Sequence, residues 1–184
     1  MGRDKALLPW RDGTFLSAAI QALQRETELV IVVAGQNASR LEPLVYRTAA
    51  FMVVNPHPEL GQMSSLQRGL EEVLNRGRDA AMVTLVDRPA PRAETIQQIK
   101  SAFLTADDEI WAAVPEYGGK HGHPIAIGRE MMEAFLRVPA TSSARDVEHA
   151  HQQHILYVPV DDPLIAVNVN TEEDYEKIRL GIKV

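Results

Sequence analysis

The chain has 184 residues, 45% of them hydrophobic, with no cysteine and a formal net charge of −6 at pH 7. The absence of cysteine excludes disulfide bonds, thiolate metal sites and cysteine nucleophiles, and the negative charge disfavours a nucleic acid as partner because phosphate backbones require clustered Lys and Arg. No apolar run approaches the roughly 20 residues of a membrane-spanning helix, and no secretory leader is visible. We therefore expect a single cytoplasmic domain over residues 1–184 that does not contact a membrane.

Helix-like and strand-like stretches alternate along almost the whole chain. The 3.6-residue period of apolar side chains predicts helices over 14–26, 64–75, 94–104, 131–136, 143–151 and 171–180, with one more short helix after Asn37. Runs of apolar, often β-branched residues predict strands over 28–35, 49–55, 80–87, 110–115 and 155–160, and the end of the glycine-rich segment 116–128 is also strand-like. This alternation predicts an α/β fold with an open, doubly wound, mostly parallel sheet. Ligand chemistry is then expected at the carboxyl ends of the strands.

The first polar cluster is the opening sequence MGRDKALLP. A lysine in a loop that contains a glycine can offer its positive charge to a phosphate group, so Lys5 is a candidate phosphate-binding residue. The alternative is that Arg3 and Lys5 are ordinary exposed charges, which is the usual state of these residue types.

The second cluster is NPHPELGQMSSLQRGL, in which a predicted strand ends at Asn55 and a helix begins near Ser64 and Ser65. Free backbone amides and hydroxyl groups at the start of a helix form an anion-binding site. The alternative is that one of the serines only caps the helix.

The third cluster is VTLVDRPAPR, in which Asp87 follows a buried strand. A carboxylate at the end of a parallel strand is a suitable oxygen ligand for Mg²⁺, which combines one or two carboxylates with substrate phosphates. The alternatives are a helix cap or a surface ion pair with Arg88 or Arg92.

The fourth cluster is LIAVNVNTEEDY. Thr171 and Asp174 have the spacing of a capping box, with Asp in place of the usual Glu. Asn168 and Asn170 are two residues apart, so in an extended chain both side chains point to the same side. Helix capping does not explain these two asparagines, and they are therefore candidate site residues.

The histidines fall into two groups. His123 lies in the glycine-rich sequence GGKHGHP, which is typical of a loop that touches a ligand or moves. His149, His151 and His154 resemble a metal site at first, but residues i and i+2 of a helix point to different faces and no acid or cysteine completes the set. We interpret these three as surface histidines.

In this order along the chain, the segments resemble the MobA/MocA-like molybdenum cofactor nucleotidyltransferases. MGRDKALLP is similar to the family's Met-Gly-x-x-Lys-x-Leu-Leu-Pro, and the Asn and Gly-x-Met-Ser-Ser of the second cluster are similar to its strand-end Asn and Gly-Met-Ser-Ser-type turn. VDRP is similar to the Asp-x-Pro, KHGHP to the Gly-His-Pro of cytidylyltransferase-like members, and NVNTEEDY to the terminal Asp/Asn-x-Asp/Asn-Thr-x-Glu-Asp. Each segment alone is a weak signal, and five in the right order are specific.

The resemblance implies a Mg²⁺-dependent transfer of a nucleoside monophosphate from a nucleoside triphosphate, with CTP favoured, to a phosphorylated acceptor such as molybdopterin, with release of pyrophosphate. By the same resemblance Lys5 and Asp87 are catalytic, with Lys5 on the triphosphate. Asp87 and Asn168 hold the metal, Asn168 standing where many relatives carry aspartate. The residues expected to contact the nucleotide or the acceptor are Gly2, Asn55, Ser64, Ser65, His123 and Asn170.

One part of the family pattern is not found in these 184 residues. In the family, a first strand and a glycine-rich loop precede the Met-Gly-x-x-Lys segment. We therefore expect an N-terminally truncated, Rossmann-like fold whose first, central strand is missing. Its absence leaves an opening one strand wide, about 4.8 Å, or lets the two neighbouring strands move together. The alternatives are a weakly active or non-catalytic paralogue that binds a nucleotide or a partner, a homo-oligomer or partner chain that completes the sheet, and a sugar-phosphate nucleotidyltransferase.

Overall fold

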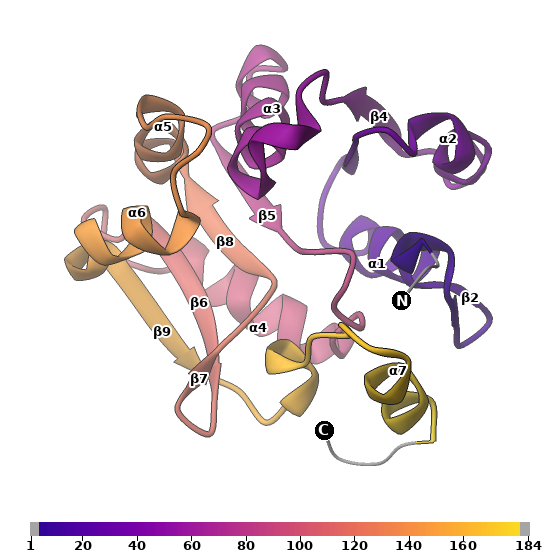
Figure 1. Cartoon of the computed structure of the whole chain (residues 1–184). Coiled ribbons are helices and arrows are strands. Elements are labelled where there is room, and N and C mark those ends of the chain that lie inside the picture. Colours follow the sequence, from indigo (N-terminus) through magenta and orange to yellow (C-terminus); the bar gives the residue numbers. More distant parts are fainter. Residues whose placement is uncertain (1–3, 181–184) are drawn as a thin grey trace.

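The computed structural model of the protein describes residues 4–180. Its helices and strands alternate along the chain, as predicted (Figure 1). The strands are β1 (Pro9–Trp10), β2 (Gly13–Thr14), β3 (Ile31–Ala34), β4 (Phe51–Val54), β5 (Ala80–Val83), β6 (Ala112–Tyr117), β7 (Lys120–His121), β8 (Ile125–Gly128) and β9 (Ile155–Pro159). The helices are α1 (Phe15–Gln24), α2 (Ala38–Arg47), α3 (Gln62–Asn75), α4 (Ala93–Leu104), α5 (Arg129–Arg137), α6 (Ala144–Ala150) and α7 (Glu172–Arg179), with short 3-10 helices at Lys5–Leu7, Pro58–Leu60, Gln152–His154 and Pro163–Ala166. Among residues 4–180, no helix is long and apolar enough to cross a membrane.

The strands form two main sheets and a small hairpin. β3 and β4 pair in parallel, and a five-stranded sheet has the order β5-β8-β6-β7, with β9 also paired to β6. The α/β class is confirmed, but the larger sheet is mixed, because β8 lies antiparallel between β5 and β6. The cause is the tight turn after β6, in which Gly118 and Gly119 have φ angles of 56° and 74°. Such a two-residue turn reverses the chain, and strands joined in this way pair antiparallel.

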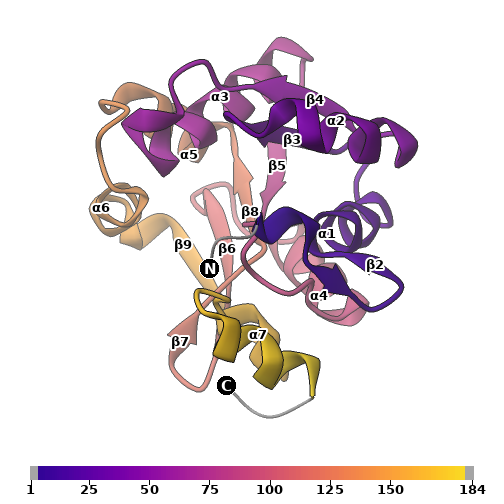
Figure 2. The same cartoon turned by 45° about the vertical axis from the view of Figure 1, so that its right-hand side comes forward.

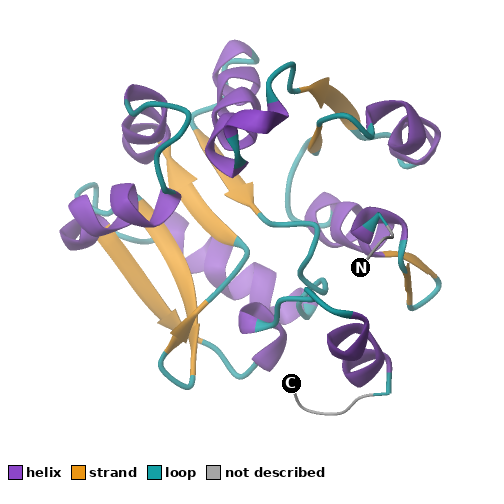
Figure 3. Ribbon diagram, in the orientation of Figure 1, coloured by secondary structure: helices purple, strands orange, loops and turns teal. Residues whose placement is uncertain are grey.

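Helices cover both faces of the five-stranded sheet (Figure 3). On one face, side chains of α3, α5 and α6 pack on β6 and β8, and Met132 and Phe135 are fully buried there. On the other face, α4 places the fully buried Ile99 against Ala113 and Ala126. The smaller sheet has its own apolar core with α1 and α2.

The start of α7 confirms the predicted capping box, and α1 begins with a similar one. Thr14 caps α1 through a reciprocal capping box with Ser17, and Thr171 caps α7 through the same arrangement with Asp174. α3 begins earlier than expected, at Gln62 with Gly61 as its cap, so the interpretation of Ser64 or Ser65 as the cap was wrong. The reason is that Ser64 lies inside the first turn, where its hydroxyl donates to the Gly61 carbonyl at 2.7 Å.

β3 and β5 both differ from the predicted strands. Among residues 4–180 they do not pair with each other. The strand expected to reach Asp87 ends at Val83, and Ile31 and Val33 are only partly buried, although a strand buried on both faces was expected. Within the described residues, each of β3 and β5 is paired on one side only, with β4 and β8 respectively. Helix α3 packs on both strands and connects the two sheets through side chains (Figure 1).

A buried carboxylate that the sequence reading did not single out fixes the start of α4. Asp162 has no exposed surface, and its oxygens accept hydrogen bonds from the Arg92 amide at 2.8 Å and the Thr95 hydroxyl at 2.9 Å. It also accepts from the amide of Leu164 at 3.1 Å. A buried charge is tolerated when several donors satisfy it in this way.

We expect Asp162→Ala to lower the free energy of unfolding by about 3 kcal/mol, because hydrogen bonds to a charged group are lost and buried donors lose their acceptor. Urea denaturation followed by circular dichroism measures this change. The matched control is Asp161→Ala at the exposed neighbouring position, which should change the free energy of unfolding by less than about 0.5 kcal/mol. Equal effects of both substitutions would contradict the assignment.

Candidate functional site

The two main sheets lie apart from each other in the ribbon view of Figure 2. Residues of both sheets line a cleft of about 1810 Å³. Its lining is mostly apolar, and we call the part formed by Lys5, Asp87 and Asn168 the polar end of the cleft. Lys5, Ser65, Asp87, His123 and Asn168 all line this cleft. Segments far apart in the sequence therefore contribute predicted site residues to one cavity, as expected for the carboxyl ends of strands in an α/β fold.

Lys5 lies at the centre of the polar end. Its ammonium group donates a hydrogen bond to Asn170 Oδ1 at 3.0 Å and lies 3.6 Å from Asp87 Oδ2. The side chains of Lys5 and Asp87 are 29% and 32% exposed, so both remain accessible to a ligand. Lys5 thus contacts two other predicted site residues, whereas Arg3, which the alternative interpretation named with it, lies outside the described residues.

The residue before Lys5 holds this segment in place. Asp4 Oδ1 accepts a hydrogen bond from the Ala6 amide at 3.1 Å, and its other oxygen accepts from Asn37 Nδ2 at 2.9 Å. Asn37 is the N-cap residue of α2, but its side chain makes no capping hydrogen bond and its Nδ2 donates to Asp4 instead. Neither the role of Asp4 nor that of Asn37 was predicted from the sequence. The only indication there was the acidic residue Asp4 next to Lys5.

The segment 167–170 confirms the alternation read from the sequence. Val167 and Val169 are buried, while Asn168 and Asn170 are exposed on the opposite side. The amide of Val169 donates to the Asp87 carbonyl at 2.9 Å, which places this segment directly beside Asp87. Two asparagine side chains and one carboxylate are thus presented together near Lys5.

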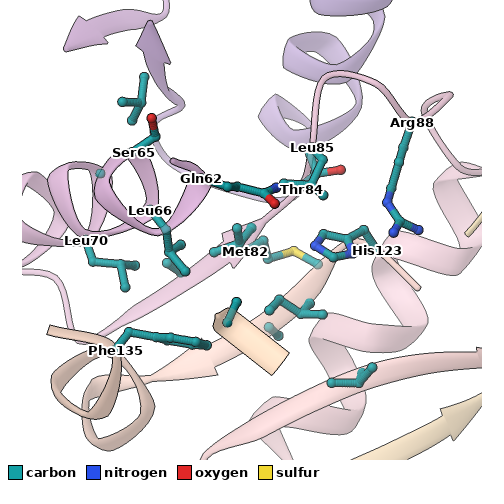
Figure 4. A pocket seen from close by; sticks show the side chains of 18 of the residues that line it. Gln62, Ser65, Leu66, Leu70, Met82, Thr84, Leu85, Arg88, His123 and Phe135 are labelled. Atoms are coloured by element: carbon teal, nitrogen blue, oxygen red, sulfur yellow. The ribbon is translucent and has the colours of Figure 1, made fainter. Parts of the chain in front are cut away.

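The second cluster forms a hydrogen-bonded turn. Asn55 is buried, and its Nδ2 lies 2.8 Å from Ser64 Oγ and 3.0 Å from Ser65 Oγ. Its Oδ1 accepts from the His57 amide at 2.9 Å. Asn55 and Ser64 therefore shape the turn, and Ser65 is the member of this group that faces the cleft (Figure 4).

His123 and Arg88 form the opposite wall (Figure 4). The Ile165 carbonyl accepts from Arg88 Nη1 at 2.9 Å and from the His123 amide at 3.1 Å. Gly122 fits closely against the same carbonyl, since a Cβ there would lie 2.1 Å from it. Burial lowers the pKa of His123 to about 3, with a further contribution from the Arg88 charge, so the imidazole is neutral at pH 7. Its Nδ1 atom is buried without a hydrogen-bond partner among residues 4–180.

A second group on the cleft wall was not found from the sequence. The ring of His121 stacks on Tyr157 with centroids 4.1 Å apart, and His121 Nε2 lies 3.2 Å from Glu116 Oε2. Nearby, burial raises the pKa of Glu148, although His121, His149 and Arg145 act in the opposite direction. These residues are on different elements, so no local motif could reveal them.

Clusters of three or more His, Cys, Asp or Glu side chains that could hold a metal do not occur in residues 4–180. His154 instead stacks on Trp111, with ring centroids 3.9 Å apart, and its Nδ1 lies 2.7 Å from the Glu109 carbonyl oxygen. A metal in the cleft would have to combine Asp87 with amide oxygens and with a ligand. Gly2, the remaining predicted site residue, lies outside the described residues.

The fold is that of the α/β nucleotidyltransferases. The structure is similar to the crystal structure of Rv0371c from Mycobacterium tuberculosis H37Rv, with a TM-score of 0.82 and 23% identity over 97% of this chain and 89% of the other. A second crystal structure of that protein, in complex with manganese, has a TM-score of 0.78 and covers 96% and 92% of the two chains at 23% identity.

The sequence comparisons agree with this fold. The family model of the MobA-like NTP transferase domain matches residues 1–155, and the chain belongs to this family. It is 27% identical over 185 residues to a molybdenum cofactor guanylyltransferase of Xanthomonas euvesicatoria, which covers 97% of this chain and 87% of the relative. It is 23% identical over 176 residues to the molybdenum cofactor cytidylyltransferase of Escherichia coli, which covers 95% and 86% of the two chains.

We expect the neutral, enclosed state of His123 to make stability depend on pH. The unfolded chain takes up a proton on this histidine near pH 6.5, whereas the folded protein does so only near pH 3. The contribution of His123 to the free energy of unfolding is therefore fully present above about pH 6.5 and is lost as the pH falls toward 3. The free energy of unfolding then changes by up to about 1.4 kcal/mol per pH unit. Chemical denaturation between pH 7 and pH 4 should show a shallower loss of stability for His123→Gln than for the wild type.

The matched control for this experiment is His57→Gln, at a histidine whose side chain is 66% exposed. This variant should keep the pH dependence of the wild type. A wild-type slope in the His123→Gln variant would show that the histidine titrates normally in the folded protein.

Proposed function

We propose that the protein transfers a nucleoside monophosphate from a nucleoside triphosphate to a phosphorylated acceptor, with release of pyrophosphate. The observation that carries this proposal is the position of Lys5 Nζ, 3.0 Å from Asn170 Oδ1 and 3.6 Å from Asp87 Oδ2, at the polar end of the cleft. A lysine ammonium group provides a positive charge for phosphate oxygens. An adjacent carboxylate provides the oxygen ligand that a metal–phosphate complex requires. Membership of the MobA-like family supports the same reaction.

In this reaction, an oxygen of the acceptor phosphate forms a bond to the α-phosphorus while the bond from that phosphorus to the pyrophosphate oxygen breaks. Catalysis of this kind depends on in-line positioning and on neutralisation of negative charge, without a covalent enzyme intermediate. Lys5 contacts the triphosphate and neutralises charge on the departing pyrophosphate. Asp4 and Asn37 hold Lys5 in position for this role.

The remaining predicted residues have positions compatible with substrate contacts. Ser65 and Asn170 are accessible at the polar end, whereas Asn55 and Ser64 support the turn that carries Ser65. We assign His123 to the acceptor side, where its neutral imidazole binds without adding a charge.

The donor set fits a hard divalent cation, which we propose to be Mg²⁺. Asp87 supplies a carboxylate and Asn168 an amide oxygen, and Mg²⁺ typically binds one or two carboxylates together with substrate phosphates. When bound, such an ion neutralises phosphate charge and orients the reacting groups. A related structure has been solved with manganese, which is consistent with a divalent site.

We propose CTP as the nucleotide and a molybdopterin-like molecule as the acceptor. The Gly-His-Pro sequence at His123 resembles the cytidylyltransferase-like members, and curated relatives include cytidylyl- and guanylyltransferases for the molybdenum cofactor. A sugar phosphate is the alternative acceptor within the same reaction class. Turnover measured separately with CTP and GTP, for each acceptor, discriminates among these substrates.

A second candidate function is nucleotide binding without transfer. The observation that favours it is the neutral amide of Asn168, since an aspartate there would bring a second negative charge to the metal. Calorimetric binding of nucleotide without release of pyrophosphate would support this function over the first.

We expect Asp87→Asn to lower the rate of pyrophosphate release from CTP by at least about a hundredfold, because the carboxylate for the divalent ion is lost. Pyrophosphate release in the presence of Mg²⁺ and acceptor measures this rate. Asp12→Asn, at an exposed position outside the cleft, is the matched control and should retain wild-type activity. Wild-type turnover by the Asp87 variant would refute its role.

We expect Asn168→Asp to strengthen Mn²⁺ binding about tenfold, because it adds a carboxylate beside Asp87. Titration followed by electron paramagnetic resonance measures the affinity without any catalytic step. Asn75→Asp, at the exposed end of α3, adds the same charge elsewhere and should leave the affinity unchanged. No difference between the two variants would remove Asn168 from the proposed metal site.

A further inference from the structure

A group of side chains on the part of the cleft wall formed by β6, β7, β9 and α6 has no role in the proposed transfer step. The group consists of Glu116, His121, Glu148 and Tyr157, and the last three line the cleft. They come from four different elements, so the fold and not a local motif brings them together. Polar and aromatic side chains that converge in a cleft in this way form a candidate binding site.

The register of the sheet places three of these side chains on one of its faces. Tyr157 is paired with Val114 of β6, and His121 is paired with Glu116, two residues further along the same strand. Residues i and i+2 of a strand point to the same face, and so do paired residues of neighbouring strands. Val114 packs in the apolar core with residues of α3, α5 and α6. The three side chains therefore lie on the side of the sheet that carries α6.

The rings of His121 and Tyr157 form a flat aromatic stack. Their centroids are 4.1 Å apart and their planes differ by 14°. His121 Nε2 also lies 3.2 Å from Glu116 Oε2, and this contact orients the imidazole. Burial, together with the charges of Glu148 and Glu116, raises the pKa of Tyr157, so the phenol is neutral at pH 7. A planar ring of a ligand can extend such a stack.

Glu148, on α6, is a half-buried carboxylate that needs donors. Among residues 4–180, no hydrogen-bond donor or cation lies within bonding distance of its oxygens, and burial raises its pKa. N–H donors stabilise a carboxylate in this state. The basic side chains of His121, His149 and Arg145 act on Glu148 from a greater distance and disfavour a ligand with a permanent positive charge. The donors are therefore expected on an uncharged group.

An aromatic stack and a carboxylate together define the chemistry of the ligand. A carboxylate has two acceptor oxygens and no donor, so it matches a ligand edge with two parallel N–H donors. In a planar, uncharged ring, a 2-amino-4-oxopyrimidine edge has this pattern, with one donor on the ring nitrogen and one on the amino group. A pterin ring and guanine both carry this edge, whereas a sugar phosphate does not.

The position of the group in the fold favours the acceptor over the nucleotide. β5, β6 and β9 run in the same direction, because β8 is antiparallel to both β5 and β6, and β9 is parallel to β6. Asp87 after β5 and His121 after β6 therefore follow strands that end at the same edge of the sheet. His121 is two residues from His123, so their Cα atoms are no more than about 7.6 Å apart. His123 is the residue that we assign to the acceptor side.

We propose that His121, Tyr157 and Glu148 bind the pterin ring of the acceptor, with the ring on the aromatic stack and its 2-amino-4-oxopyrimidine edge on the carboxylate. This inference rests on the proposed transfer function and specifies its acceptor, because it favours a molybdopterin-like molecule over a sugar phosphate. The three residues determine which acceptor binds and take no part in the bond changes at phosphorus.

The test measures binding of two ring compounds to the full chain without nucleotide, metal or turnover. One is 2-aminopteridin-4-one, and the other is pteridine-2,4-dione, which has a carbonyl oxygen in place of the amino group. Titrations followed by the fluorescence of the pteridines should show that the amino compound binds at least about tenfold more tightly. The reason is that the dione lacks the amino donor and places an oxygen lone pair against the carboxylate.

A pair of charge variants tests the carboxylate. Glu148→Gln should weaken binding of the amino compound at least about tenfold and reduce its preference over the dione, because an amide has only one acceptor oxygen. Glu42→Gln, at an exposed position of α2 outside the cleft, is the matched control and should change neither. Equal binding of both compounds to the wild type would overturn the proposal, and so would an unchanged preference in the Glu148 variant.

A second set of variants tests the aromatic stack. Tyr157→Leu should weaken binding of both compounds at least about fivefold, whereas Tyr157→Phe keeps the ring and should bind them like the wild type. Tyr46→Leu, at a residue that is 62% exposed and outside the cleft, is the control. Circular dichroism verifies folding, and if Tyr157→Leu does not fold, the preference of the wild type for the amino compound decides. Wild-type binding by a folded Tyr157→Leu protein would overturn the role of the stack.

Guanosine distinguishes the two sources of the recognised edge. Tighter binding of guanosine than of 2-aminopteridin-4-one, with the same loss in Glu148→Gln, would assign the edge to a nucleotide base and overturn the acceptor assignment. Failure of the proposed function appears in a separate measurement, pyrophosphate release, which the titrations do not use. Ring binding with the expected preference but without pyrophosphate release would support this site and contradict only the transfer reaction.

Discussion

The arrangement of the site depends on the Asp4–Lys5 segment, which joins three separate parts of the chain. Asp4 binds Asn37 after β3, while Lys5 contacts Asp87 after β5 and Asn170 before α7. No strand pairing connects the two main sheets within residues 4–180, so these polar contacts and the packing of α3 determine how the sheets face each other. The charged and amide groups of the proposed phosphate site therefore also hold the two sheets relative to each other.

Much of the local structure could be predicted from the sequence because it depends on neighbouring residues. The capping box at Thr171 follows from a hydroxyl and an acceptor group three residues apart, and it is present. The alternation of Val167 and Val169 with Asn168 and Asn170 also follows from strand geometry alone. The order of motifs was sufficient to place the chain in its family, since the MobA-like model matches residues 1–155.

Features that depend on distant residues could not be predicted in this way. The sequence around Asn55 and Ser64 suggested ligand contacts, but whether these groups bind each other or a ligand depends on the fold of the turn. The perturbed pKa of His123 arises from Arg88 and from burial, and neither is visible in the sequence GGKHGHP. Strand length was overestimated at β5, which ends at Val83 and not at Asp87. The substrates and the metal remain predictions.

The connection between the two sheets has a consequence for the dynamics of the protein. Side-chain packing of α1 and α3, rather than a continuous backbone ladder, joins β3 and β4 to the five-stranded sheet. Among residues 4–180, opening of the smaller sheet therefore breaks no strand pairing in the larger one. Lys5 lies at the boundary between the two sheets, so its position reports on both.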